Sequence, residues 1–137
     1  MTQDLDKATS NIANTTKADA AYLETMKTAV VDAIEDIKGF DITVMDVRKL
    51  TSMTSYMIVA SATSSRQAKA VADNVRTVLK EKNYPIRGTE GEDAGEWVLV
   101  DLGDIVVHIM LPTTRAYYNL EQLWGEAESR RGHIKAE

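Results

Sequence analysis

Two aspartates, Asp101 and Asp104, are the first candidates for chemistry, because neighbouring carboxylates can hold Mg²⁺ for phosphoryl or nucleotidyl transfer. Alternate residues of a strand share a face, so a metal-binding pair would normally lie two positions apart. Asp101 and Asp104 are separated by Leu102-Gly103 and flank a turn instead. Their spacing therefore favours a structural role in a hairpin turn.

His108 and the hydroxyl-rich segment Ser61–Ser65 are the other polar candidates. His108 interrupts an apolar run, Ile105–Leu111, and the only other histidine is His133, so histidines alone cannot assemble a metal site. A hydrogen-bonded structural histidine is favoured. The Ser61–Ser65 segment precedes a predicted helix whose free N–H groups could bind phosphate, but no glycine-rich loop accompanies it. Helix capping by these hydroxyls is therefore favoured.

Aromatic residues near the end of the chain point to binding of a partner. Although the chain is only 6% aromatic, both tryptophans and two tyrosines follow residue 96: Trp97, Tyr117, Tyr118 and Trp124. On the predicted strand, Trp97, Leu99 and Asp101 share one face, which is mixed as expected around an aromatic anchor. The alternative is that Trp97 only lies beneath the last helix.

The last predicted helix carries the other aromatic residues. Tyr117, Leu120 and Trp124 recur at helical spacing and predict one buried or partner-facing stripe. Tyr118 and Leu123 either extend that stripe or lie outside it. On the predicted strand that carries Trp97, the opposite face is typical of core and consists of Val98, Val100 and Leu102.

Hydrophobic periodicity predicts eight elements in the order α, β, β, α, β, β, β, α. The first helix has an apolar stripe and ends at Gly39; this stripe comprises Leu23, Met26, Val30, Ile34 and Ile37. Strands are expected at 42–47 and at 56–62, where the continuous apolar run indicates coverage on both faces. A helix over 66–82 follows, with Ser64 and Gln67 matching a capping box.

The remaining elements form the second half of the domain. Residues 84–86 are expected to begin a short strand, and residues 88–96, rich in glycine and carboxylates, to form a surface loop. Two strands, 96–102 and 105–111, make a hairpin around Gly103-Asp104. Pro112 ends the second strand, Thr113 or Thr114 caps, and a helix covers 115–124. The expected fold class is α/β: a helix-flanked mixed β-sheet of about five strands.

The length, composition and net charge of the chain exclude several classes of protein. With 137 residues and 44% hydrophobic content, we expect one domain over 20–125, between a flexible polar leader (1–19) and a polar tail (126–137). The chain lacks cysteine and has a net charge of -5, which argues against thiolate sites and against extensive direct binding of nucleic acid. No apolar stretch approaches the roughly 20 residues that span a bilayer, and no targeting signal is evident, so a cytoplasmic location is expected.

Two segments resemble the ribosomal silencing factor (Iojap) family: DITVMDVRKLTSMTSYMIVASATSSRQAKAVADNV and GEWVLVDLGDIVVHIMLPTTRAYYNLEQLWG. The resemblance covers roughly residues 22–125. It implies a reduced nucleotidyltransferase-like sheet and binding to the large ribosomal subunit through ribosomal protein L fourteen. Occupying that position would block association with the small subunit and repress translation, notably under nutrient limitation.

The resemblance also implies which residues bind the partner: Trp97, Leu99, Asp101, Arg115, Tyr117, Tyr118, Leu123 and Trp124. It implies no cofactor, metal or catalytic turnover. Active nucleotidyltransferases carry a Gly-Ser loop and a metal-holding aspartate pair, and this sequence matches neither pattern.

Two alternatives stay open at this point. One is a metal-dependent nucleotidyltransferase or related phosphoryl-transfer enzyme that uses Asp101, Asp104 and Ser61–Ser65. The other is a homodimer that forms through the aromatic surface when the partner is absent.

Overall fold

A computed structural model describes residues 20–125; the expected leader (1–19) and tail (126–137) lie outside them. The described elements follow the predicted order. They are a helix over residues 20–36, β1 (Phe40–Asp46), β2 (Tyr56–Ser61), α2 (Ser65–Glu81), β3 (Gly88–Glu90), β4 (Trp97–Asp101), β5 (Ile105–Met110) and α3 (Pro112–Tyr118). Residues 120–125 are again helical.

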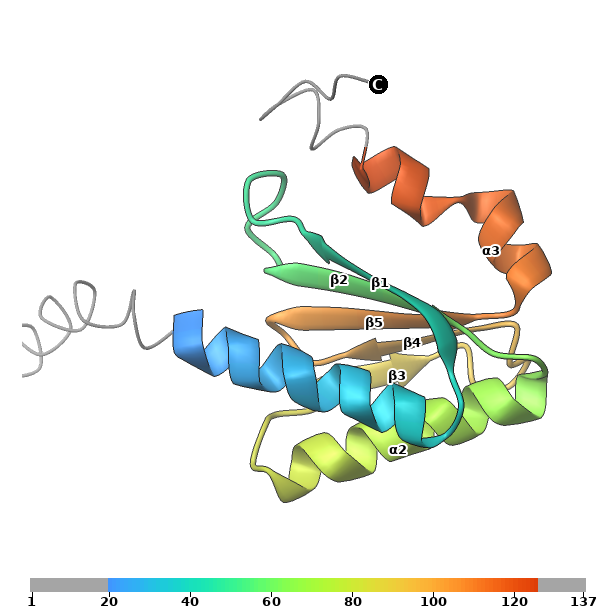
Figure 1. Ribbon diagram of the computed structural model, residues 1–137, viewed down its shortest axis with the longest axis horizontal. Coiled ribbons are helices and arrows are strands. Elements are labelled where there is room, and N and C mark those ends of the chain that lie inside the picture. Colours follow the sequence, from blue (N-terminus) through green and yellow to red (C-terminus); the bar gives the residue numbers. More distant parts are fainter. Residues whose placement is uncertain (1–19, 126–137) are drawn as a thin grey trace, which may run out of the picture.

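The strands form one mixed sheet in the order β1-β2-β5-β4-β3, which confirms the predicted α/β class. β2 runs parallel to β5, and the other neighbouring pairs are antiparallel. The 20–36 helix and α2 cover one face of the sheet, while α3 lies on the other face (Figure 1). Every residue of β2 is buried, as its unbroken apolar sequence predicted.

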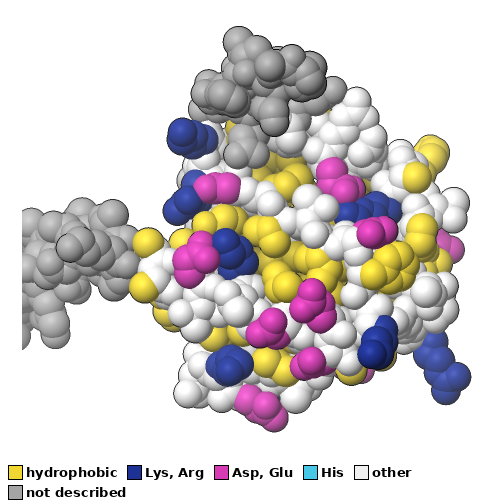
Figure 2. All heavy atoms as spheres, viewed as in Figure 1, with side chains coloured by type: hydrophobic (Ala, Val, Ile, Leu, Met, Phe, Trp, Pro, Cys, Tyr) yellow, Lys and Arg dark blue, Asp and Glu magenta, His cyan; other side chains and the backbone are white. Residues whose placement is uncertain are grey.

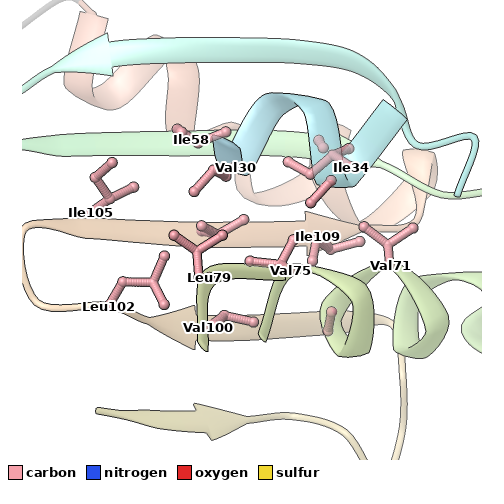
Figure 3. Close-up of a cluster of buried hydrophobic side chains, with 14 of the residues drawn as sticks. Val30, Ile34, Ile58, Val71, Val75, Leu79, Val100, Leu102, Ile105 and Ile109 are labelled. Carbon is pink, nitrogen blue, oxygen red and sulfur yellow. The ribbon is translucent and has the colours of Figure 1, made fainter. Parts of the chain in front are cut away.

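The main core lies between the sheet and the two helices. The helix stripe predicted from Leu23 to Ile34 is buried, and so is the inner face of α2, which comprises Ala68, Val71, Ala72, Val75 and Leu79. Figure 3 shows these side chains meeting those of the sheet, including Ile58 of β2, Val100 of β4 and Ile109 of β5. On the outer side of the helices, Asp and Glu side chains are spread over the surface (Figure 2), so both helices are amphipathic as expected.

The start of α2 confirms helix capping in the hydroxyl-rich segment. The hydroxyl of Ser64 accepts a hydrogen bond from the backbone N–H of Gln67 at 3.1 Å. The side-chain oxygen of Gln67 accepts from the backbone N–H of Thr63 at 2.6 Å, whereas a standard capping box would return this bond to Ser64. The reciprocal bond is therefore displaced by one residue.

Two sequence expectations about boundaries are wrong. Residues 84–86 are not a strand; the strand is β3, inside the segment expected to be a loop, because Gly88–Glu90 pairs with the free edge of β4. The last helix begins at Pro112 with no side-chain cap, so neither Thr113 nor Thr114 caps it. Proline suits this first helical position because its missing N–H would have no partner there.

None of the helices within residues 20–125 combines the length and the apolar character that crossing a membrane requires.

Gly91 connects β3 to the loop before β4 and is the position where the fold needs glycine most. Its φ is +85°, and a Cβ atom there would lie 2.0 Å from the backbone oxygen of Trp97. A side chain would therefore meet both backbone strain and a clash with main chain that cannot easily move.

We predict that Gly91→Ala lowers the free energy of unfolding by about 1–3 kcal/mol, because alanine is strained at positive φ. Urea denaturation monitored by circular dichroism measures the change. Gly88→Ala is the matched control, since a Cβ there meets nothing within 4 Å, and it should change stability by less than about 0.5 kcal/mol. Equal stability of the two variants would contradict the prediction.

Candidate partner-binding surface

The two faces of β4 separate as the sequence predicted. Val98, Val100 and Leu102 are buried in the main core. Trp97 and Leu99, on the opposite face, are partly buried, and that face of the sheet looks away from the 20–36 helix and α2. The sheet therefore presents Trp97 on the same side as α3.

Trp97 lies between the sheet and the end of α3. Its indole Nε1–H donates a hydrogen bond to Nδ1 of His108 on β5 at 2.9 Å. Its ring centroid lies 4.8 Å from that of Tyr118 and 5.8 Å from that of His108. Trp97 is thus partly covered by α3 and only partly available to a partner.

His108 is the buried, hydrogen-bonded histidine that the sequence favoured. It is 5% exposed, and desolvation by burial lowers the pKa of its imidazole to about 4. At neutral pH the ring is therefore uncharged. A neutral imidazole can accept one hydrogen bond, and Trp97 is the donor.

The segment 112–125, which we call the strap, covers part of the sheet face that carries Trp97. Asn119 interrupts it with φ 50° in the left-handed region, so the strap consists of α3 and a second helical turn. From the second part, Leu120 and Trp124 pack on a smaller apolar cluster formed by β1, the residue that follows it, β2 and β5; its buried members are Met45, Val47, Met57, Val59 and Met110. The strap therefore completes a second core.

The break at Asn119 corrects the predicted helical stripe. Tyr117 is 80% exposed, whereas Leu120 and Trp124 pack against the second core, so these three residues do not share a face. Tyr118 and Leu123 are 52% and 63% exposed. We call Trp97, Tyr117, Tyr118 and Leu123 the aromatic surface.

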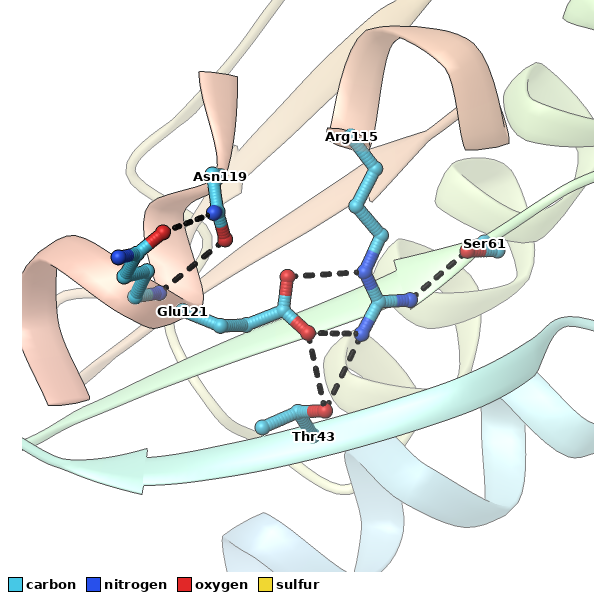
Figure 4. A network of polar contacts seen from close by, with 6 residues as sticks. Thr43, Ser61, Arg115, Asn119 and Glu121 are labelled. Atoms are coloured by element: carbon cyan, nitrogen blue, oxygen red, sulfur yellow. Dashed lines mark hydrogen bonds and ion pairs between the residues drawn. The ribbon is translucent and has the colours of Figure 1, made fainter. Parts of the chain in front are cut away.

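Arg115 faces the protein interior, where it joins the strap to the sheet (Figure 4). Its side chain is 11% exposed. The guanidinium donates to Ser61 Oγ at 2.7 Å, to Thr43 Oγ1 at 3.1 Å and to both carboxylate oxygens of Glu121 at 3.1 and 2.7 Å. Arg115 is therefore placed to hold the strap in position, while the exposed residues of the strap are the ones accessible to a partner.

Sequence reasoning missed Glu121 as the partner of Arg115. In a continuous helix, residues six positions apart do not face each other. The left-handed residue Asn119 turns the chain so that Glu121 reaches back to Arg115. An asparagine inside an otherwise helical pattern was the available signal for this break.

The carboxylate of Asp101 and the main chain of Asp104 both have structural roles at the hairpin. Asp101 Oδ1 accepts from the backbone N–H of Gly103 at 2.9 Å, and Gly103 has φ +86°, which confirms the predicted turn. The backbone oxygen of Asp104 accepts from the N–H groups of Ser55 and Tyr56. Across residues 20–125, no three side chains of the metal-binding types come together as a cation site.

We predict that Glu121→Gln lowers the free energy of unfolding at pH 7 by about 1–2 kcal/mol, because a charge-assisted bond to a nearly buried guanidinium is lost. The hydrogen bond from Arg115 holds the pKa of Glu121 below its usual range. A lowered folded-state pKa gives stability that is present above the unfolded pKa and is lost as pH falls through the folded one.

Urea denaturation between pH 7 and pH 3 measures this contribution. The loss of stability toward acid should be smaller in Glu121→Gln than in the unmodified protein. Glu96→Gln, which removes an exposed carboxylate outside the network, is the control and should leave the pH profile unchanged. Identical profiles for all three proteins would show that the Glu121 bond contributes nothing.

Comparisons with known proteins agree with this architecture. A family model described as "Ribosomal silencing factor during starvation" matches residues 20–137. A ribosomal silencing factor of Chromobacterium violaceum is 56% identical over 95 residues, which is 69% of this chain and 78% of that protein. The mouse protein named "Mitochondrial assembly of ribosomal large subunit protein 1" is 39% identical over 98 residues, covering 69% of this chain and 43% of that protein.

Solved structures show the same fold. The crystal structure of a Chromobacterium violaceum protein superposes with a TM-score of 0.73 at 52% identity, covering 74% of this chain and 85% of that one. A Bacillus halodurans crystal structure gives a TM-score of 0.68 at 32% identity, covering 74% of this chain and 94% of that one. The match of the family model to residues 20–137, which is most of the chain, and the identity to a named member show that this chain belongs to the ribosomal silencing factor family.

Proposed function

We propose that this protein binds the large ribosomal subunit through ribosomal protein L fourteen and sterically blocks association with the small subunit. Translation is thereby repressed, notably under nutrient limitation. Membership of the ribosomal silencing factor family supports the proposal. A relative whose name refers to assembly of the ribosomal large subunit points to the same particle.

The observation that carries the proposal is the aromatic surface. Tyr117, Tyr118 and Leu123 expose large apolar side chains on one short segment, and Trp97 contacts them through Tyr118. Tyrosine and tryptophan are enriched at the energetic centres of protein interfaces. Exposed apolar groups gathered in this way are typical of a docking site.

The strap presents this surface in a fixed orientation. Leu120 and Trp124 anchor it to the second core, and Arg115 bonds it to β1 and β2. A partner therefore meets side chains whose backbone is already ordered, which reduces the entropy lost on binding.

Charge also suits this partner. The net charge of -5 favours encounter with a basic ribosomal protein and disfavours contact with rRNA phosphates. Asp101 and the partly buried Leu99 continue the Trp97 face along β4, and we include both in the proposed interface.

We propose that the protein acts as a steric blocker in the cytoplasm, without a cofactor or catalytic turnover. Asp101 and Ser64 act in a turn and a helix cap, and Ser61 is bonded to Arg115. When free of the ribosome, the same aromatic surface pairs with a second copy of the chain.

The first test is sedimentation of purified large and small ribosomal subunits, with and without the protein, at fixed magnesium and salt. We expect the protein to travel with the large subunit and the joined particle to be depleted. If the protein sediments apart from both subunits, the proposed function is wrong.

A second prediction concerns Trp97, the proposed central aromatic residue of the interface. Trp97→Ala should weaken binding to isolated ribosomal protein L fourteen by 2 kcal/mol or more, roughly 30-fold, because a central aromatic residue contributes about this much. Tyr117→Ala, which alters a side chain 80% exposed, should weaken binding without changing stability. Isothermal titration calorimetry measures both affinities, and thermal melts check folding.

Tyr22→Ala is the matched control for these variants. Tyr22 is an exposed aromatic residue, 42% accessible, on the 20–36 helix at the opposite face of the sheet. The Tyr22→Ala variant should bind ribosomal protein L fourteen with the affinity of the unmodified protein. Equal weakening by Tyr22→Ala and Tyr117→Ala would place the interface elsewhere.

A further inference from the structure

His108 carries an unusual combination of bonds for a buried side chain. Its Nδ1 accepts the indole N–H of Trp97, so in the neutral ring the proton resides on Nε2. Within residues 20–125, this Nε2 is buried and has no hydrogen-bond partner. The imidazole therefore gains one hydrogen bond and leaves one polar group unsatisfied.

The surroundings of His108 would suit an apolar residue. Its neighbours across the sheet on the same face are Val59 of β2 and Leu99 of β4. An aliphatic side chain in this place would remove the orphaned Nε2–H, which is costly when buried, but it would leave the indole N–H of Trp97 without its acceptor. The apolar contacts within the sheet therefore do not explain the histidine.

What the histidine provides is an acceptor for Trp97. With its N–H turned inward to His108 and its ring against Tyr118, the indole has one fixed orientation. Its donor is already used, so only carbon atoms of the ring remain for contact with a partner. Because burial lowers the pKa of His108 to about 4, the ring keeps its acceptor lone pair at neutral pH.

We propose that His108 is a positioning residue for partner binding: it orients Trp97 so that the indole offers the partner an apolar surface and no hydrogen-bond donor. This inference rests on the proposed function. It specifies the chemistry of the partner's site, which receives Trp97 in an apolar pocket without a matching acceptor.

Two variants separate positioning from stability. His108→Leu removes the orphaned N–H but also the acceptor of the Trp97 indole, so these two effects on stability offset each other and the melting temperature should change little, while affinity for the large subunit falls about ten-fold. His108→Gln supplies an amide oxygen that can accept from Trp97, and it should restore most of the affinity. A loss of affinity without a matching loss of stability is not expected of a merely structural residue.

The orientation of the indole is read directly by NMR. The chain has two tryptophans, so a ¹⁵N-labelled protein gives two indole N–H signals, and Trp124→Phe assigns them. The Trp97 signal should shift in His108→Leu and return toward its original position in His108→Gln. Val107→Ala, which truncates a main-core residue on the neighbouring position of β5, is the control: it should lower stability and leave the Trp97 signal unchanged.

The outcomes distinguish this inference from the proposed function. Normal affinity of a folded His108→Leu variant, or failure of His108→Gln to restore affinity, overturns the positioning role. If the unmodified protein does not bind the large subunit, the proposed function fails and the partner-directed role of His108 fails with it. The NMR signal then still decides the intramolecular part: an unshifted Trp97 resonance in His108→Leu shows that His108 does not orient the indole.

Discussion

The burial of β2 on both of its faces is the constraint on which the rest of the structure depends. All six residues from Tyr56 to Ser61 are buried, and a strand of this kind is stable only when both sides of the sheet are covered. The 20–36 helix and α2 cover one side. The other side is covered by the strap, whose Leu120 and Trp124 complete the second core.

Because the strap covers the face of the sheet opposite the two helices, the proposed docking surface lies on that face. The inner residues of the strap, Leu120 and Trp124, pack on the sheet, and its outer residues, Tyr117 and Leu123, stay exposed. Arg115 holds the strap against the sheet by bonding to Thr43 and Ser61, and it joins the two parts of the strap by bonding to Glu121. The same segment thus closes the core and displays the aromatic surface.

Much of the fold could be predicted because its signals are local. The helix stripes, the capping serine at Ser64 and the alternation along β4 each depend on residues close together in sequence. β3 could not be predicted, since Gly88–Glu90 becomes a strand only by pairing with β4. The same applies to the candidate site: Trp97 could be singled out from its face of β4, but the inward orientation of Arg115 depends on the break at Asn119 and on two distant strands.

The parallel pairing of β2 with β5 limits how early the sheet can form while the chain is being synthesised. Tyr56 pairs with Ile105, so the middle of the sheet cannot close until nearly fifty further residues have been synthesised, and the strap that seals it follows later still. Synthesis proceeds from the N-terminus at roughly 5–20 residues per second, and during those seconds β2 has only β1 as a partner. The edge of β2 that faces β5 thus stays unpaired until β5 has been made, and the aromatic surface cannot form before the strap, the last of the described elements, has been synthesised.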